Sequence, residues 1–502
     1  MKKTVIVIGG GLGGLFTGAF LSKEGYQVTV LEKNATIGGG LQCFKRNGTS
    51  FETGMHILGG FQPGGNLNRI CAYLGILDKL QMQFTDAEAM DVITYGEDGR
   101  CYKLPSGKEA FTNYLKEQFP AETEGIQQYM DALYSLCQKI DLFNLRSGKG
   151  HFFAHDDDDE AFMPADKFIA KYVTNSRLRD LLAYMSPMYG GIAGHTPTYI
   201  HAMINVLYIN GSSQFIGGSQ QLADCLADII RENGGQVIAG DAVAHIEVHN
   251  RFANRVITQS KKEYSADWYI SDVHPDTLFS LTGNGAFPKS YVDRVRSIPN
   301  SYSAFSVYLK FKSETQPYVN HPCYYQERYE TVWQLGDYDE DNFPQGFMYI
   351  TPPSRNQGPW AERMIVNCLM PFEPVRKWEH TTVGHRGADY QAWKERLMNK
   401  VINKLDALHP GFRDSIEMAF ASSPLTIRDY YGVKDGSLYG HQWDCENMVR
   451  SQMPIVTKVR NLLLTGQNVN LHGICGVPLT AIETAETIVG RGMIVEKISK
   501  IK

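Results

Sequence analysis

The feature that most constrains the fold of this chain is a glycine-rich turn close to its first residue. Residues 4–22 carry no charged side chain, and six of these nineteen residues are glycine. An uncharged run of this length behind two lysines is also typical of a signal peptide or a membrane-spanning helix. A spanning helix is disfavoured because each glycine costs about 1 kcal/mol of helix propensity relative to alanine. A signal peptide is disfavoured because no small-x-small cleavage site follows the run.

The same residues fit a strand, a turn and a helix. Residues 5–8 are β-branched throughout, which is typical of a strand buried on both faces of a sheet. The sequence GGGLGG follows and contains the pattern GxGxxG at Gly9, Gly11 and Gly14. A helix is then predicted from Leu15 to Glu24, and a second buried strand follows and ends at Glu32.

The spacing of these elements predicts a dinucleotide-binding domain. Gly9 permits the tight turn, Gly11 lets a pyrophosphate approach the backbone, and Gly14 lets the helix pack closely on the strand. The start of the helix offers unpaired N–H groups and a partial positive charge to the phosphates. Glu32 follows Gly11 by 21 residues, close to the spacing of a carboxylate that accepts the ribose hydroxyls. The predicted fold class is therefore α/β, with a Rossmann-type sheet.

The residues after Glu32 indicate which dinucleotide binds. Glu32 and Lys33 are followed by three glycines at 38–40 and by the sequence FETGMH at 51–56. This arrangement resembles the FAD-dependent oxidoreductases around phytoene desaturase, carotenoid isomerase and retinol saturase, which have an amine-oxidase-like FAD fold. Its motifs are most similar to those of retinol saturase. The resemblance implies FAD as the cofactor, although Gly40 stands where many relatives have an arginine.

A segment near the end of the chain extends the resemblance. An apolar strand at 462–464 leads to Gly466 and to Asn468, where relatives usually have an aspartate that binds the ribityl chain. We expect Pro478 to be the first residue of a helix that runs to about Val489. That helix would direct its positive end at the flavin C2 carbonyl.

The resemblance implies a set of cofactor contacts from several separate segments. After the glycine pair at 217–218, the family residue that matches Val243 pairs its backbone with adenine. The implied FAD-binding residues are Gly9, Gly11, Leu12, Gly13, Gly14, Glu32, Lys33, Gly39, Gly40, Leu41, Gly54, Met55, Val243, Gly466, Asn468, Gly476 and Val477.

His56 is the candidate catalytic residue. The resemblance places it at the flavin face, where a polar group could steer a substrate or donate a proton; the alternative is a histidine that bonds nearby backbone. Cys475 has no CxxC partner, and we expect it to pack rather than to react. The acidic run at 156–160 is interpreted as a solvated loop, and His151 and His155 lack the intervening Glu of a zinc protease, so no metal site is predicted.

The three landmarks predict a discontinuous FAD domain, made of residues 1–82, 206–290 and 455–502. Residues 83–205 are expected to form a mostly helical insert, with one helix at 126–145. Residues 291–454 are expected to form a substrate domain with a mixed sheet. That domain includes a strand at 305–311 with one apolar and one polar face, and a long helix near 390–408. Aromatic residues of the inserts could line an apolar tunnel or belong to ordinary core.

Composition excludes several other classes. The net charge is −5 and no basic stripe is present, so nucleic acid is not an expected partner. The nine cysteines are scattered without a CxxC motif, which suits free thiols in a reducing, cytoplasmic compartment.

The sequence therefore predicts an FAD-dependent oxidoreductase that acts on carbon–carbon double bonds of an apolar isoprenoid or polyene substrate, by saturation, desaturation or isomerisation. A flavin amine oxidase and a flavin-free prenyl- or lipid-binding escort are the alternatives. No second GxGxxG follows a predicted strand, so no separate nicotinamide domain is expected. The electron donor or acceptor stays unknown, and a peripheral membrane contact stays open.

Overall fold

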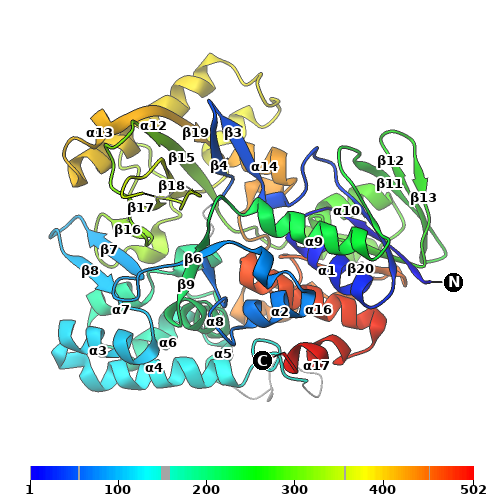
Figure 1. The fold of residues 1–502 in the computed structure, drawn as a ribbon, viewed down its shortest axis with the longest axis horizontal. Coiled ribbons are helices and arrows are strands. Elements are labelled where there is room, and N and C mark those ends of the chain that lie inside the picture. The colour runs from blue at the N-terminus through cyan, green and yellow to red at the C-terminus, as the bar shows by residue number, and fades with distance from the viewer. Residues whose placement is uncertain (1, 55–56, 148–158, 356–357, 452, 502) are drawn as a thin grey trace.

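A five-stranded parallel sheet holds the glycine-rich turn near its centre. The computed structural model describes residues 2–54, 57–147, 159–355, 358–451 and 453–501. The strand order is β10 (Gln236–Ile238), β2 (Gln27–Leu31), β1 (Thr4–Ile8), β14 (Trp268–Ser271) and β20 (Leu462–Leu464). The sheet thus joins strands from three distant parts of the chain, on the right of Figure 1.

Both faces of this sheet are buried, as the β-branched run predicts. Val5 and Val7 pack among the helices α1 (Leu12–Lys23), α9 (Gln220–Glu232) and α16 (Gly473–Val489). Ile6 and Ile8 point the other way, into a core shared with a three-stranded antiparallel sheet. That sheet consists of β11 (Val243–His249), β12 (Phe252–Thr258) and β13 (Glu263–Tyr264). The predicted Rossmann-type fold class is confirmed.

A second, mixed sheet of seven strands lies at the upper left of Figure 1. Its order is β19 (Ile416–Ser422), β15 (Ser303–Phe311), β18 (Arg363–Met370), β17 (Gly346–Ile350), β16 (Cys323–Gln326), β7 (Asp91–Tyr95) and β8 (Cys101–Leu104). The helix α12 (Ala388–Leu408), which the sequence predicts, packs Tyr390 and Trp393 against the apolar core of this sheet.

Helices and short strands complete the structure. The remaining helices are α2 (Asn66–Leu74), α3 (Lys108–Gln118), α4 (Thr123–Gln138), α5 (Asp159–Phe162), α6 (Ala165–Tyr172), α7 (Ser176–Leu182), α8 (Thr198–Ile209), α10 (Pro275–Thr282), α11 (Lys289–Arg296), α13 (Phe412–Ser415), α14 (Pro424–Tyr431), α15 (Met448–Ser451) and α17 (Met493–Ser499). The remaining strands are β3 (Cys43–Arg46), β4 (Thr49–Glu52), β5 (Ile57–Gly59), β6 (Met82–Phe84) and β9 (Ser212–Phe215). Among the described residues, no helix is both long enough and apolar enough to cross a bilayer.

The region 83–205 contains two strands beside its helices. Its strands β7 and β8 extend the seven-stranded sheet, and β7 pairs in parallel with β16. The helix expected at 126–145 ends at Gln138. Asn144 explains the early end, because its side chain donates to the carbonyls of Cys137 and Ile140 at 2.8 and 2.7 Å and satisfies the last turn. The domain boundaries themselves stay a prediction.

The polar face of the strand β15 is not exposed to solvent. Ser306 and Tyr308 are as buried as the apolar residues that alternate with them. The reason is the β3–β4 hairpin, whose Phe44 and Phe51 pack edge-on against the Tyr308 ring at 5.5 and 5.8 Å between centroids. The hairpin therefore covers the polar face of β15.

Candidate dinucleotide site

The glycine turn is closed too tightly for side chains. Gly9 has a φ of +103°, and Gly11 caps α1, which begins at Leu12 rather than at the expected Leu15. A Cβ atom at Gly14 would lie 2.1 Å from the carbonyl oxygen of Gly9, and one at Gly13 would lie 2.7 Å from the Cα of Gly466. Glycine is therefore needed for the turn to close on itself and for the segment at Gly466 to approach it. A pyrophosphate-binding turn requires the same close approach to backbone.

The second glycine cluster lies directly beside the turn. The N–H of Gly38 donates to the carbonyl of Gly10 at 2.7 Å, and a Cβ at Gly39 would lie 3.2 Å from the Cα of Gly11. Leu41 is buried, and Gly40 faces the hydroxyl of Tyr431. Residues far apart in sequence thus form one backbone-lined recess at the start of α1.

Glu32 lies at the edge of this recess. Its side chain is 6% exposed and accepts hydrogen bonds from the N–H groups of Gly10 and Asn34 at 2.8 and 2.7 Å. These bonds hold the carboxylate beside the turn. The segment before β11 runs alongside, because the N–H of Asp241 donates to the Glu32 carbonyl at 3.1 Å. Val243 follows two residues later.

The last segment completes the recess from the opposite side. Thr465 and Thr17 of α1 share a hydroxyl hydrogen bond of 2.9 Å, which holds Gly466 against the turn. Asn468 accepts a hydrogen bond from the N–H of His441 at 3.1 Å.

Two predicted contact residues lie near the helix α14. Lys33 donates to the carbonyl of Asp429 at 2.9 Å, and burial lowers its pKa. Gly54 follows Thr53, whose hydroxyl bonds the Gly40 carbonyl at 2.8 Å. Met55 and the catalytic candidate His56 lie outside the described residues, as do His151, His155 and residues 156–158 of the acidic run.

The helix α16 begins earlier than expected. It starts at Gly473, so that Gly476 and Val477 lie in its first turns and Pro478 lies inside it. Pro478 has no N–H to donate to the Ile474 carbonyl, so the helix continues through it with one backbone hydrogen bond fewer. The positive end of the helix is therefore at Gly473, one to two turns before the position that Pro478 suggests.

The side chains at this helix start are neutral. Burial raises the pKa of Cys475 to about 12, and its thiol donates to the Gly59 carbonyl at 3.2 Å. Burial lowers the pKa of His472 to about 4. Since the indole N–H of Trp443 donates to Nδ1 of His472 at 3.3 Å, the proton of the neutral ring is on Nε2. Cys475 is thus a packed thiol, as the sequence predicts.

Asp272 is the residue that sequence reasoning missed. It follows β14, and both carboxylate oxygens lie against the glycine turn. Nothing in the GxGxxG pattern indicates it, because it comes from a strand more than 250 residues further along the chain. Asp272 lies beside the turn because β14 pairs in parallel with β1, and adjacent parallel strands end at the same edge of a sheet.

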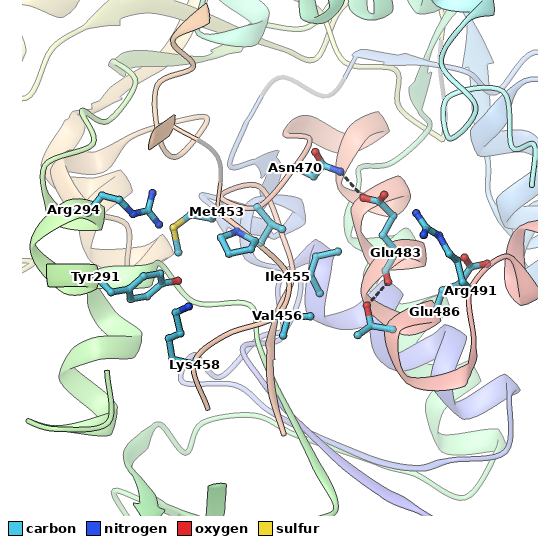
Figure 2. A pocket seen from close by; sticks show the side chains of 13 residues that line it. Tyr291, Arg294, Met453, Ile455, Val456, Lys458, Asn470, Glu483, Glu486 and Arg491 are labelled. Carbon is cyan, nitrogen blue, oxygen red and sulfur yellow. Dashed lines mark hydrogen bonds between the residues drawn. The ribbon is translucent and has the colours of Figure 1, made fainter. Parts of the chain in front are cut away.

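A large cavity lies away from these residues, along the C-terminal half of α16 (Figure 2). Its volume is about 990 Å³, and no predicted cofactor residue lines it. Glu483 accepts a hydrogen bond from Asn470 there, and burial raises its pKa to about 7. Glu486 accepts from the N–H groups of Ile494 and Val495 at 2.8 and 2.9 Å and so caps α17.

Comparison with known proteins places this architecture. The family described as NAD(P)-binding Rossmann-like domain matches residues 7–74. An all-trans-retinol 13,14-reductase of Danio rerio is 24% identical over 99% of this chain and 88% of its own length. The chloroplastic prolycopene isomerase 2 of an Oncidium hybrid cultivar is 24% identical over 87% of this chain and 74% of its own length. The expected family resemblance is confirmed.

Solved structures agree on the fold. The structure of putrescine oxidase bound to putrescine superposes with a TM-score of 0.64 and covers 98% of this chain and 100% of its own, at 15% identity. At that identity the similarity concerns the fold alone. The similarity to the reductase and the isomerase spans both sheets, so it is not confined to the glycine motif.

Proposed function

We propose that this chain is an FAD-dependent oxidoreductase acting on carbon–carbon double bonds of an apolar isoprenoid or polyene substrate. The observation that supports this most is the nearly full-length similarity to a retinol reductase and to a prolycopene isomerase, two enzymes of polyene double bonds. The intact glycine recess supports it independently, because a protein that did not bind a dinucleotide would have no need of it.

The recess fits the cofactor. The turn Gly9–Gly14 with Gly39, Gly40 and Gly466 would receive the pyrophosphate, and Glu32 would accept the ribose hydroxyls. When bound, the flavin supplies the hydride chemistry. The start of α16 would stabilise negative charge on the ring. His472 and Cys475 at this helix start are neutral, so no thiolate at Cys475 repels that charge.

An apolar pocket beside the start of α16 supports the substrate class. Its walls are Phe143, Ile200, Met203, Ile204, Leu207, Leu471, His472, Cys475, Gly476 and Leu479. Its volume is only about 20 Å³, room for a single water. A polyene would therefore need side chains of α8 to move, and the flexible Met203 is suited to that. Among the described residues, the Nε2–H of His472 has no hydrogen-bond partner, and it is a polar group of this pocket.

The alternatives have weaker support. A flavin amine oxidase shares the fold, but residues 472–477 contain no aromatic side chain of the kind that holds an amine in those enzymes. A flavin-free lipid escort would not require the close glycine contacts. We further propose a cytoplasmic protein with an apolar small-molecule substrate, peripheral contact with membranes and an electron partner yet to be identified.

Two measurements test the proposal. The purified protein should be yellow and release FAD on denaturation; a colourless protein that binds no added FAD would contradict it. Anaerobic reduction or reoxidation of the flavin should then occur with retinoids or carotenoids and not with amines. A response to amines alone would favour the oxidase alternative.

A further inference from the structure

The Asp272 carboxylate fills the space in front of the glycine turn. The backbone N–H of Asp272 donates to the Ile8 carbonyl at 2.9 Å, which fixes the residue at the end of β1. A Cβ atom at Gly13 would lie 2.4 Å from Oδ1, one at Gly11 would lie 2.7 Å from Oδ2, and one at Gly466 would lie 2.3 Å from Oδ1. The side chain thus lies against both the glycine turn and the segment at Gly466.

The Asp272 side chain lies where the start of α1 favours a bound anion. The N–H groups of Gly11 and Gly14 act on the carboxylate and favour its charged form, at the positive end of α1. Burial and the neighbouring Glu32 act more strongly in the opposite direction, and the pKa of Asp272 is raised to about 7. A pyrophosphate in the same recess would compete for the same N–H groups and would repel the charge.

The other titratable groups nearby do not share this role. The first turn of α1 has no acidic residue. His274 follows Asp272 in the chain, but its ring contacts Asn300 and His441. Burial lowers the pKa of His274, and that of His441 to about 3, so both rings are neutral near pH 7. Within the part of the chain that the structure describes, Glu32 is the charged group that acts on the carboxylate.

We propose that Asp272 controls the loading of the cofactor: its ionised form occupies the anion site of the turn, and FAD binds with uptake of one proton by this side chain. The protonated carboxyl then donates its O–H to a phosphate oxygen. The inference rests on the proposed function, because it assumes that the dinucleotide enters this turn. It adds a residue that tunes cofactor affinity and a dependence of that affinity on pH.

The sign of the pH dependence follows from linkage. Below the pKa of Asp272 in the free protein the side chain is already neutral and FAD binds without hindrance. Above it, each pH unit weakens binding up to tenfold, because the proton must be recovered. From pH 6 to pH 8 the Kd of the wild-type apoprotein should rise about tenfold.

The experiment is a titration of apoprotein with FAD by isothermal calorimetry at pH 6 and pH 8, in buffers of different ionisation enthalpy. Wild type should take up close to one proton at pH 8. Asp272→Asn should bind with the same Kd at both pH values, about tenfold tighter than wild type at pH 8, and without proton uptake. Asp276→Asn is the matched control, since Asp276 pairs with Arg296 on the surface nearby and should keep the wild-type pH dependence.

Other outcomes are distinguishable. A wild-type Kd that does not change with pH, or an Asp272→Asn variant with the wild-type Kd and only a lower Tm, would overturn the inference and make Asp272 a structural cap. Asp272→Ser provides the same comparison if the asparagine variant folds poorly, and proton uptake by wild type needs no variant. Failure of wild type to bind FAD at either pH would instead overturn the proposed function and this inference with it.

Discussion

Asp272 and Glu483 both have a pKa raised to about 7, and their surroundings differ completely. Asp272 lies in a recess closed by five glycines, against N–H groups at the start of α1. Glu483 lies on the side of α16, in an open cavity of about 990 Å³, with Asn470 as its hydrogen-bond partner. Burial is the main cause of both shifts.

Neither the size of a cavity nor a shifted pKa identifies a ligand-binding site by itself. In the open cavity Glu483 meets one amide, and the other side chains are a mixture of apolar and charged residues (Figure 2). In the small recess several backbone segments converge because glycine lets them. Convergence of donors marks a place for a ligand more reliably than volume does.

The most severe test of the recess is Gly14→Val. Its Cβ would lie 2.1 Å from the Gly9 carbonyl, so the turn must move and the cofactor should be lost, with at least a hundredfold weaker FAD binding. FAD content after purification and apoprotein titration measure this. The control is Gly358→Ala, because a Cβ there meets nothing within 4 Å. Wild-type FAD content in Gly14→Val would refute the assignment of the turn.

Glu32→Gln should have the next largest effect. The amide keeps a single acceptor oxygen for two backbone donors and a ribose, so FAD affinity should fall about tenfold. Loss of its charge should also lower the pKa of Asp272, so that the weakening of FAD binding begins at a lower pH. Calorimetric titration across pH 5–9 shows both effects. An unchanged affinity would remove Glu32 from the site.

Glu483→Gln tests the open cavity. A carboxyl whose pKa is raised on folding stabilises the protein below its unfolded pKa and loses that contribution as pH rises through about 7. The variant should therefore unfold about 1–3 °C higher than wild type at pH 8.5, with no difference near pH 4 and no change in FAD affinity. Thermal unfolding at both pH values checks this. A change in FAD Kd would break the contrast between the two carboxyls.

Cys475→Ser should have the smallest effect. The buried thiol donates to the Gly59 carbonyl and is protonated, so a serine should retain that bond at a stability cost of about 1 kcal/mol. FAD content and turnover should stay at the wild-type level. Cys101→Ser, at an exposed cysteine, is the control. Loss of turnover with FAD retained would give Cys475 the redox role that its missing CxxC partner argues against.

The sequence could predict the parts of the fold that local chemistry determines. The strands β1 and β2 and the glycine turn follow from periodicity and glycine spacing, and they lie close to where the pattern places them. The cover of β15 by the β3–β4 hairpin could not be predicted, because contact between distant segments decides it. The start of α16 was misplaced because proline favours the first position of a helix, whereas Pro478 lies inside this one.

The candidate site divides in the same way. The glycines can be recognised from their spacing in the sequence. Asp272 lies beside the turn because β14 pairs with β1, and no sequence motif marks it. The contacts predicted with FAD remain proposals for each residue, and His56 lies outside the described residues. What sequence lacks is the register between strands, and the register decides which side chain faces the glycines.

The pairing of β14 with β20 has a consequence for biosynthesis. Gly466 and the start of α16 close the recess, yet they leave the ribosome more than 400 residues after the turn that they complete. A nascent chain therefore exposes the apolar edge of β14 from the synthesis of that strand until β20 has emerged, and it cannot retain the cofactor before this last segment is present. Ribosome-bound chains stalled before residue 460 should be protease-sensitive and unable to hold FAD, whatever the concentration supplied.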